Sequence, residues 1–298
     1  MLRFNAILTL FILLSGAVYC QEEPLSREEQ NEKYKGFEFY INGGLYMPNN
    51  YTANYYNGTP GNENNTDFVF KNVYRNQEIT ELLKNRYQIT DNTVAVREWP
   101  TDMAYSSAFM FGLGIKYKFN LDLELCVQAH SVRLETVDKF SIGITTGAAS
   151  NIHNDYLLYN IIGKERRSLI DIGLMHTFHT SEHIKYFVEG GININNVKVK
   201  ESTIVIEEVP FSLINNLNGP YIPGTGVSTY DVIQAGTNFG FYAAGGIKLI
   251  LNQYFSLDPT ITMHYARTNL AGYTEFKPHF SFMARLCISD RFITGNKE

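Results

Sequence analysis

The residues of this chain best suited to chemistry are its histidines and its acid–base pairs. His176, His179 and His183 fall within the string HTFHTSEH, which invites a metal-site interpretation. Side chains alternate between the two faces of a strand, so His176 and His179 point to opposite sides, whereas metal ligands must converge. Asp258 and His264 share a face, but six strand residues separate them by about 20 Å. Neither group predicts a metal or catalytic site.

Motifs for nucleophilic catalysis or cofactor binding do not fit either. The sequence has no GxSxG stretch of the lipase kind. The glycines of FGLGIK lack the third glycine and the following helix of a dinucleotide site. A net charge of -5 and a pI near 5.8 argue against a nucleic-acid partner. The sequence therefore predicts no enzyme, no cofactor and no metal.

Most charged residues instead lie in long stretches that alternate with a period of two. Residues 238–267, NFGFYAAGGIKLILNQYFSLDPTITMHYAR, place apolar side chains on one face of each arm and mixed polar ones on the other. Each arm has about 12 residues, more than a usual soluble strand and enough to cross a bilayer at a tilt. This stretch predicts a β-hairpin whose apolar face meets either lipid or a protein core.

The same alternation recurs along the chain and predicts eight strands. They cover residues 36–47, 108–119, 121–134, 170–178, 185–200, 239–251, 255–266 and 279–289. Long connections at 48–104, 137–167 and 206–233 alternate with short ones, and residues 78–87 predict a short amphipathic helix. Breaks in the alternation near Ser131 and at Asn195–Asn196 are interpreted as β-bulges or slips.

Short turns at one end and long loops at the other are typical of an outer-membrane barrel. The sheet must close in lipid, because an open edge would leave backbone groups unpaired. We therefore predict an all-β fold: an eight-stranded antiparallel up-and-down transmembrane β-barrel with short periplasmic turns and long extracellular loops.

Several strand patterns resemble a known family. FGLGIKYKF, FVEGGININ and YAAGGIKLIL, with a last strand that ends in the aromatic Phe292, are similar to the small eight-stranded outer-membrane barrels, the group of the OmpA transmembrane domain and the OmpX-like proteins. The resemblance covers about Phe37 to Phe292, although such barrels often finish on the terminal aromatic and residues 293–298 follow it here. It implies a bacterial outer-membrane location, contact with outer-membrane lipid and with the barrel-assembly machinery, but no particular activity.

The N-terminus reads as a secretory signal. Residues 1–20 have Arg3 at the start, an apolar middle and small residues before the expected cleavage after Cys20. Lipidation of Cys20 is the alternative, but Tyr19 is bulky where that signal needs a small residue. Residues 21–35 are then a polar periplasmic leader, 36–292 the barrel domain and 293–298 a C-terminal tail.

If lipid lies outside, the opposite strand faces bring charges of both signs into the lumen. An eight-stranded barrel is just wide enough to be filled by its own side chains, and isolated buried charges are costly, so these charges are expected to pair. We predict a lumen ion-pair network that fills the barrel. Its members are Glu38, Lys116, Asp122, Glu124, Arg133, Asp171, Lys185, Glu189, Lys248, Asp258 and Arg285.

With a filled lumen and no catalytic site, function falls to the loops, which are rich in Tyr, Asn and Thr. The first hypothesis is a non-enzymatic outer-membrane protein with a structural or adhesive role and a surface ligand of unknown identity. Two alternatives stay open. One is a small outer-membrane pore, and the other is a soluble lipocalin-like carrier, also an eight-stranded barrel, whose apolar face would point inward.

Overall fold

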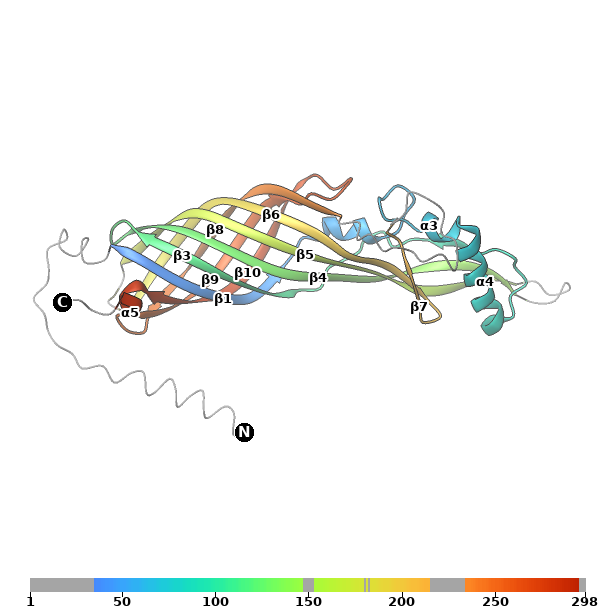
Figure 1. The fold of residues 1–298 in the computed structure, drawn as a ribbon, viewed down its shortest axis with the longest axis horizontal. Coiled ribbons are helices and arrows are strands. Elements are labelled where there is room, and N and C mark those ends of the chain that lie inside the picture. The colour runs from blue at the N-terminus through green and yellow to red at the C-terminus, as the bar shows by residue number, and fades with distance from the viewer. Residues whose placement is uncertain (1–34, 147–152, 180, 182, 215–233, 295–298) are drawn as a thin grey trace, which may run out of the picture.

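Within the residues that the structure describes, eight strands form a closed ring. The computed structural model describes residues 35–146, 153–179, 181, 183–214 and 234–294. The ring strands are β1 (Gly36–Met47), β3 (Ala108–Lys118), β4 (Leu123–Thr146), β5 (His153–His179), β6 (Ile184–Ile206), β8 (Ala235–Ile250), β9 (Phe255–Arg267) and β10 (Phe276–Ser289). Each pairs antiparallel with the next in chain order, and β10 pairs with β1 to close the ring (Figure 1). The predicted eight-stranded up-and-down barrel is confirmed.

The two faces of the ring differ in polarity. Large apolar side chains cover the outside, where more than half of the surface of Ile41, Leu113 and Phe241 is exposed. Charged side chains such as Lys116 and Arg285 are fully buried inside. An exposed apolar surface that runs around a whole barrel requires lipid rather than water. The soluble-carrier alternative is therefore wrong, because it needs the apolar face inside.

No helix among the described residues is both long and apolar enough to cross a bilayer.

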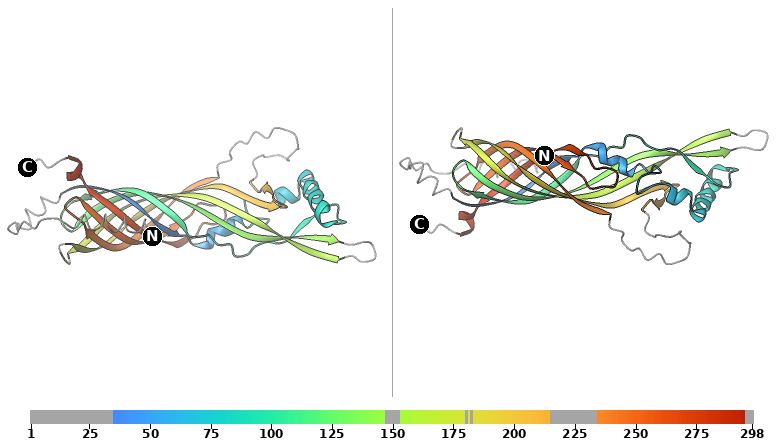
Figure 2. Two further views of the ribbon diagram at one scale, coloured as in Figure 1. Left: turned by 90° about the horizontal axis from the view of Figure 1, so that it is seen from below. Right: turned by 90° about the horizontal axis from the view of Figure 1, so that it is seen from above.

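Three neighbouring strands continue beyond the barrel. β4, β5 and β6 have 24, 27 and 23 residues, against 11 to 16 in the other ring strands. Past the barrel, β2 (Ala95–Glu98) pairs with β4 and β7 (Val209–Ser212) pairs with β6. Figure 2 shows this narrow sheet leaving one end of the ring, which we call the cap end. The opposite end, with short turns at 119–122 and 251–254, is the turn end.

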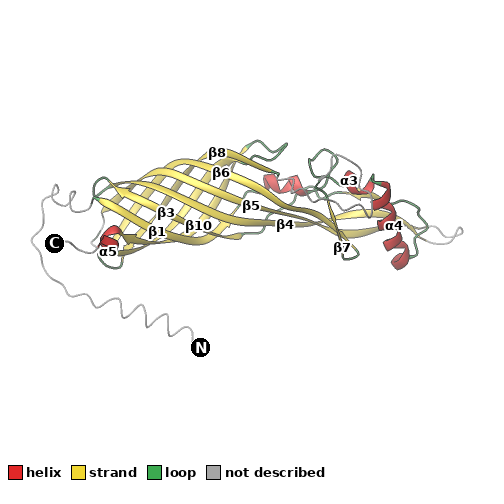
Figure 3. Ribbon diagram, viewed as in Figure 1, coloured by secondary structure: helices red, strands yellow, loops and turns green. Residues whose placement is uncertain are grey.

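The helices gather at the two ends (Figure 3). At the cap end lie η1 (Asn50–Tyr56), α3 (Asp67–Phe70) and α4 (Val73–Tyr87), and at the turn end lies α5 (Asp290–Thr294). The predicted helix at 78–87 is thus confirmed within α4. The helix begins earlier because the side chain of Asn72 caps it by accepting a hydrogen bond from the backbone N–H of Arg75 at 3.1 Å.

The long connection at 48–104 folds onto the protruding sheet and makes a hydrophobic core. Ile79 and Leu83 of α4 are fully buried there, together with Phe140 of β4 and Ile204 of β6. We call this unit the cap: residues 50–98 with the parts of β4–β7 that extend past the ring. The first predicted loop is therefore a folded subdomain, and the barrel has an apolar core beyond its end.

The second predicted loop, 137–167, is mostly strand, because β4 and β5 continue through it. No bulge occurs near Ser131 or Asn195: the pairings of β4 with β5 and of β6 with β8 are unbroken there, and Val132 faces the same side as Gln128. Apolar residues change sides there because the inner face now packs against the cap while the outer face meets water. The register shift lies elsewhere, where Lys164 pairs with Glu201 and Glu165 with Val199.

The remaining boundaries are partly outside the described residues. The third predicted loop, 206–233, contains β7, and residues 215–233 are not described. β10 stops at Ser289, where the alternation at 279–289 predicts its end, so the strand end at Phe292 that the resemblance implies is wrong. Phe292 lies in α5 and contacts the ring of Phe255, with the ring centroids 5.2 Å apart. The predicted signal peptide (1–20), the leader up to residue 34 and residues 295–298 of the tail lie outside the described residues.

Candidate functional site

Near the turn end, the lumen is crossed by lysine–carboxylate pairs. The Nζ atom of Lys116 lies 2.7 Å from the Oδ2 of Asp258, and both side chains are fully buried. The Nζ atom of Lys248 lies 2.9 Å from the Oε2 of Glu38 and 3.8 Å from the Oε1 of Glu124. Because these residues come from β1, β3, β4, β8 and β9, the pairs join walls of the barrel that are distant in sequence.

In the middle of the lumen, a buried arginine is matched to one glutamate. The Nη1 of Arg285 lies 2.6 Å from the Oε2 of Glu189, and the hydroxyl of Tyr242 donates to the Oε1 of Glu189 at 2.7 Å. The Arg285 guanidinium also lies over the rings of Tyr40 and Phe187, at 5.4 and 5.8 Å from their centroids. This layer leaves the carboxylate satisfied at both oxygens.

In the part of the lumen nearer the cap end, several polar side chains contact Asp171. Its Oδ1 accepts from the Asn193 amide at 2.6 Å, and its Oδ2 accepts from the Gln128 amide and lies 3.1 Å from the Nε2 of His264. His264 therefore contacts Asp171 and not Asp258, which Lys116 occupies. Among the described residues, no three His, Cys, Asp or Glu side chains are arranged to hold a metal ion.

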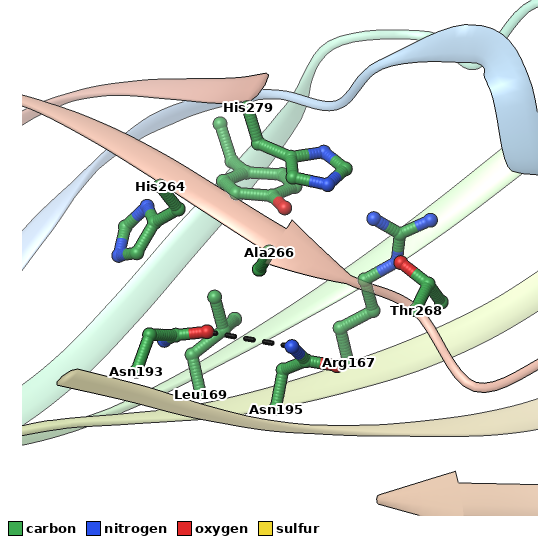
Figure 4. A pocket seen from close by; sticks show the side chains of 9 residues that line it. Arg167, Leu169, Asn193, Asn195, His264, Ala266, Thr268 and His279 are labelled. Carbon is green, nitrogen blue, oxygen red and sulfur yellow. Dashed lines mark hydrogen bonds between the residues drawn. The ribbon is translucent and has the colours of Figure 1, made fainter. Parts of the chain in front are cut away.

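Between Asp171 and the cap end lies a small cavity (Figure 4). Side chains that line it include Tyr46, Arg167, Asn195, His264 and His279. Its volume is about 10 Å³, which is the space of one water molecule. The cavity is far too small for a ligand, and it lies among side chains that fill the lumen.

A second charged cluster fastens the cap to the barrel. Arg167 Nε donates to the Oε1 of Glu165 at 2.6 Å, and Arg167 Nη2 donates to the hydroxyl of Thr52 in η1 at 2.8 Å. The hydroxyls of Tyr56 and Tyr105 both donate to the Oε2 of Glu165, at 2.8 and 3.0 Å. Burial, and then the Glu165 carboxylate, raise the pKa of both tyrosines, so both stay protonated donors. We call these five residues the latch.

The predicted lumen residues fall into three groups. Eight are buried inside the ring: Glu38, Lys116, Glu124, Asp171, Glu189, Lys248, Asp258 and Arg285. Asp122 and Lys185 are half-buried at the turn end. Arg133 is wrong as a lumen residue, because the alternation of β4 runs without a bulge and places it on the outer face.

Sequence analysis missed the latch. Glu165 and Arg167 lie two apart on one face of β5, a spacing that brings opposite charges together, but the sequence predicts a long connection at 137–167 and no strand there. Of the predicted histidine string, His176 lies on the outer face with its ring centroid 4.7 Å from that of Phe178, and His183 is exposed in a turn.

A closed ring with an apolar outside and a filled, charged inside decides the class of protein. The chain is a membrane β-barrel. No protein-family model and no curated protein matches its sequence.

Several solved structures are similar to this barrel at low identity. Neisserial surface protein A has 8% identity over 85% of this chain and 96% of that chain, with a TM-score of 0.41. The N-terminal β-barrel domain of Pseudomonas aeruginosa OprF has 9% identity over 86% and 98%, with a TM-score of 0.35. Ail, the attachment invasion locus protein of Yersinia pestis, in complex with the heparin analogue sucrose octasulfate, has 9% identity over 85% and 99%, with a TM-score of 0.36. All three belong to the small outer-membrane barrels that the sequence resembles, and the membrane-barrel assignment itself stands on the ring and faces of this chain.

Proposed function

We propose that this barrel is a non-enzymatic integral outer-membrane protein that holds its cap outside the cell as a module for surface interaction, of adhesive or structural type. The observation that carries the proposal is the cap itself. Three ring strands run without interruption into it, and the buried latch joins it to the barrel wall. A folded unit on so rigid a support suits the presentation of a surface, since binding residues are commonly carried on a rigid scaffold.

The location and partners are part of the same proposal. The apolar outer band supports contact with outer-membrane lipid, and a closed barrel of this kind supports insertion by the barrel-assembly machinery after export through the signal peptide. In that orientation the turn end faces the periplasm and the cap end faces the outside.

The outer face of the β4–β5 hairpin offers a surface for such an interaction. Val137, Tyr156 and Leu158 are more than half exposed, although they lie well past the lipid-facing band. Large apolar side chains that are exposed outside both lipid and core are features of interaction surfaces. The surface ligand is therefore expected to meet an apolar, aromatic patch on this hairpin.

Cells that display the barrel test the adhesive role. Retention on polystyrene and self-sedimentation are expected to rise severalfold over cells with an empty vector. Replacement of the hairpin residues (Tyr156→Ser with Leu158→Ser) is expected to return both to baseline, because it removes the apolar patch. A matched variant at exposed cap residues of α4 (Val73→Ser with Tyr74→Ser) should retain the wild-type behaviour. Display without any gain in retention would rule out the adhesive role.

The pore alternative makes an opposite prediction about the lumen. The pairs Lys116–Asp258 and Arg285–Glu189 occupy it with side chains that are fully buried. We therefore expect purified barrel in planar bilayers to give no conductance steps above baseline. The double variant Arg285→Ala with Glu189→Ala serves as a positive control, because it removes two large lumen side chains. Regular steps from the wild-type protein would establish the pore instead.

A further inference from the structure

Three cations lie side by side in one row across the outer face of the protruding sheet. Arg133 of β4 is directly opposite Arg166 of β5, which is directly opposite Lys198 of β6. Arg133 and Arg166 are exposed, and Lys198 is half-exposed. Like charges directly opposite each other destabilise a sheet. A row of three therefore calls for a compensating anion.

The row is close to the edge of the lipid. Towards the barrel the next outward-facing row is polar, with Ser131, Ser168 and Asn196, and the row after it is apolar, with Ala129, Ile170 and Ile194. The cations lie four positions along each strand from this last lipid-facing row. That is about 13 Å along a strand, or roughly 10 Å along the bilayer normal at the usual tilt. Long basic side chains reach back towards the interface from such positions.

One contact shows the direction in which the central arginine leans. The Nε of Arg166 donates to the hydroxyl of Ser131 at 3.0 Å, and Ser131 belongs to the row nearer the lipid. This hydrogen bond directs the guanidinium towards the membrane and leaves its two terminal nitrogens available for an anion.

The neighbouring row, further from the lipid, is neutralised within the protein. There the Nζ of Lys164 lies 2.9 Å from the Oε2 of Glu201 and 3.8 Å from the Oε1 of Glu135. Across the described ranges, neither Arg133, Arg166 nor Lys198 has a carboxylate within 4.0 Å. The cations without an acidic partner are thus those nearest the headgroups.

We propose that Arg133, Arg166 and Lys198 form a binding site for phosphate-bearing lipid headgroups in the leaflet around the cap end. Guanidinium groups match the oxygens of a phosphate in geometry and charge, and basic residues at a membrane surface attract anionic lipid. The site depends on the membrane orientation of the barrel and not on the proposed adhesion, which uses the hairpin beyond it.

The full-length barrel in phosphatidylcholine vesicles tests the site. Electron paramagnetic resonance of spin-labelled phosphatidylglycerol and spin-labelled phosphatidylcholine gives the preference for the anionic lipid. We expect a preference of roughly fivefold, which 0.5 M NaCl should weaken. The row variant (Arg133→Gln, Arg166→Gln and Lys198→Gln) should lose it. A cap variant with the same charge change (Lys71→Gln, Lys84→Gln and Arg86→Gln) should keep it.

The urea concentration at the unfolding midpoint gives a second measurement. The difference in this midpoint between the row variant and the wild type should have opposite signs in neutral and in anionic vesicles. In neutral vesicles the row variant should be more stable than the wild type, because it lacks the repulsion. In vesicles with phosphatidylglycerol the wild type should be the more stable of the two. If the triple variant fails to fold, Arg166→Gln alone should still show part of the loss of lipid preference and part of the shift in the urea midpoint.

Other outcomes would overturn the proposal. The same lipid preference in wild type and row variant would do so. Loss of retention on immobilised heparin without any change in lipid preference would mark a polysaccharide site instead. Binding of inorganic phosphate at millimolar concentration without a lipid preference would mark a site for the free ion.

Discussion

The Arg285→Met variant is expected to unfold with a free energy lower than that of the wild type by about 3–5 kcal/mol, because it leaves the Glu189 carboxylate buried without its cation. In the wild type the two groups are 2.6 Å apart and neither side chain is exposed. Urea unfolding in phospholipid vesicles, followed by circular dichroism, measures the difference. Methionine keeps much of the volume, so the loss reports on charge and not on a cavity.

Two further variants separate the buried pair from ion pairs in general. Lys71 and Asp67 are also 2.6 Å apart, but the Lys71 side chain is 75% exposed, so Lys71→Met should cost less than about 1 kcal/mol. The double variant Arg285→Met with Glu189→Gln should recover most of the loss, because the glutamine still accepts from the Tyr242 hydroxyl and no unpaired charge remains. An Arg285→Met variant as stable as Lys71→Met would mean that water reaches the lumen charges, and the barrel would not be filled as described.

The ring of strands could be predicted because its signal is local. Apolar residues alternate with polar ones over the whole of β1, β3, β8 and β9, and each strand shows this within its own sequence. A period of two sets the face of each side chain. Alternation in the sequence does not say which medium lies on which side, and the burial of the charged face decides that.

The protruding sheet could not be predicted by the same rule. At Val132 and Val197 the apolar residues pass to the inner face, although the strands continue in register. When one alternating pattern is assumed for a whole strand, this inversion is interpreted as a slip. The slip places Arg133 on the wrong face, and the latch residues of β5 are not recognised as part of a strand. The physical cause is a change of solvent along one strand: lipid outside and charge inside within the membrane, water outside and an apolar core inside above it.

The sequence could not predict which charged side chains of the lumen pair with each other. Charges of both signs on the inward faces predict that pairs form, but Lys116 and Asp258 are 142 residues apart in the chain. Their contact depends on the relative height of β3 and β9 on opposite sides of the ring. The stagger of several successive strand pairs determines that height, and each stagger is set by packing and turn geometry together.

The second large prediction concerns the outer face of the sheet. It compares two leucines that are equally exposed but lie at different distances from the middle of the membrane. Leu113 in the middle of β3 is 65% exposed, and Leu158 in the β4–β5 hairpin is 64% exposed. In water the two positions would be equivalent. If the ring lies in a bilayer, Leu113→Arg places a charge near the midplane, where it should lower the free energy of unfolding measured in vesicles by about 2–4 kcal/mol.

Leu158→Arg lies beyond the lipid and should change the folding free energy by less than about 0.5 kcal/mol, as is usual for an exposed surface residue. The loss of stability in Leu113→Gln should lie between those of Leu113→Arg and Leu158→Arg, because an uncharged polar group is less costly in hydrocarbon than an arginine. The comparison uses one residue type, one strand geometry and one exposed fraction, so that depth in the membrane is the variable that remains. Equal and small effects of arginine at both positions would mean that water surrounds the ring, and the lipid-facing outer band, from which the cap's position outside the cell is argued, would be wrong.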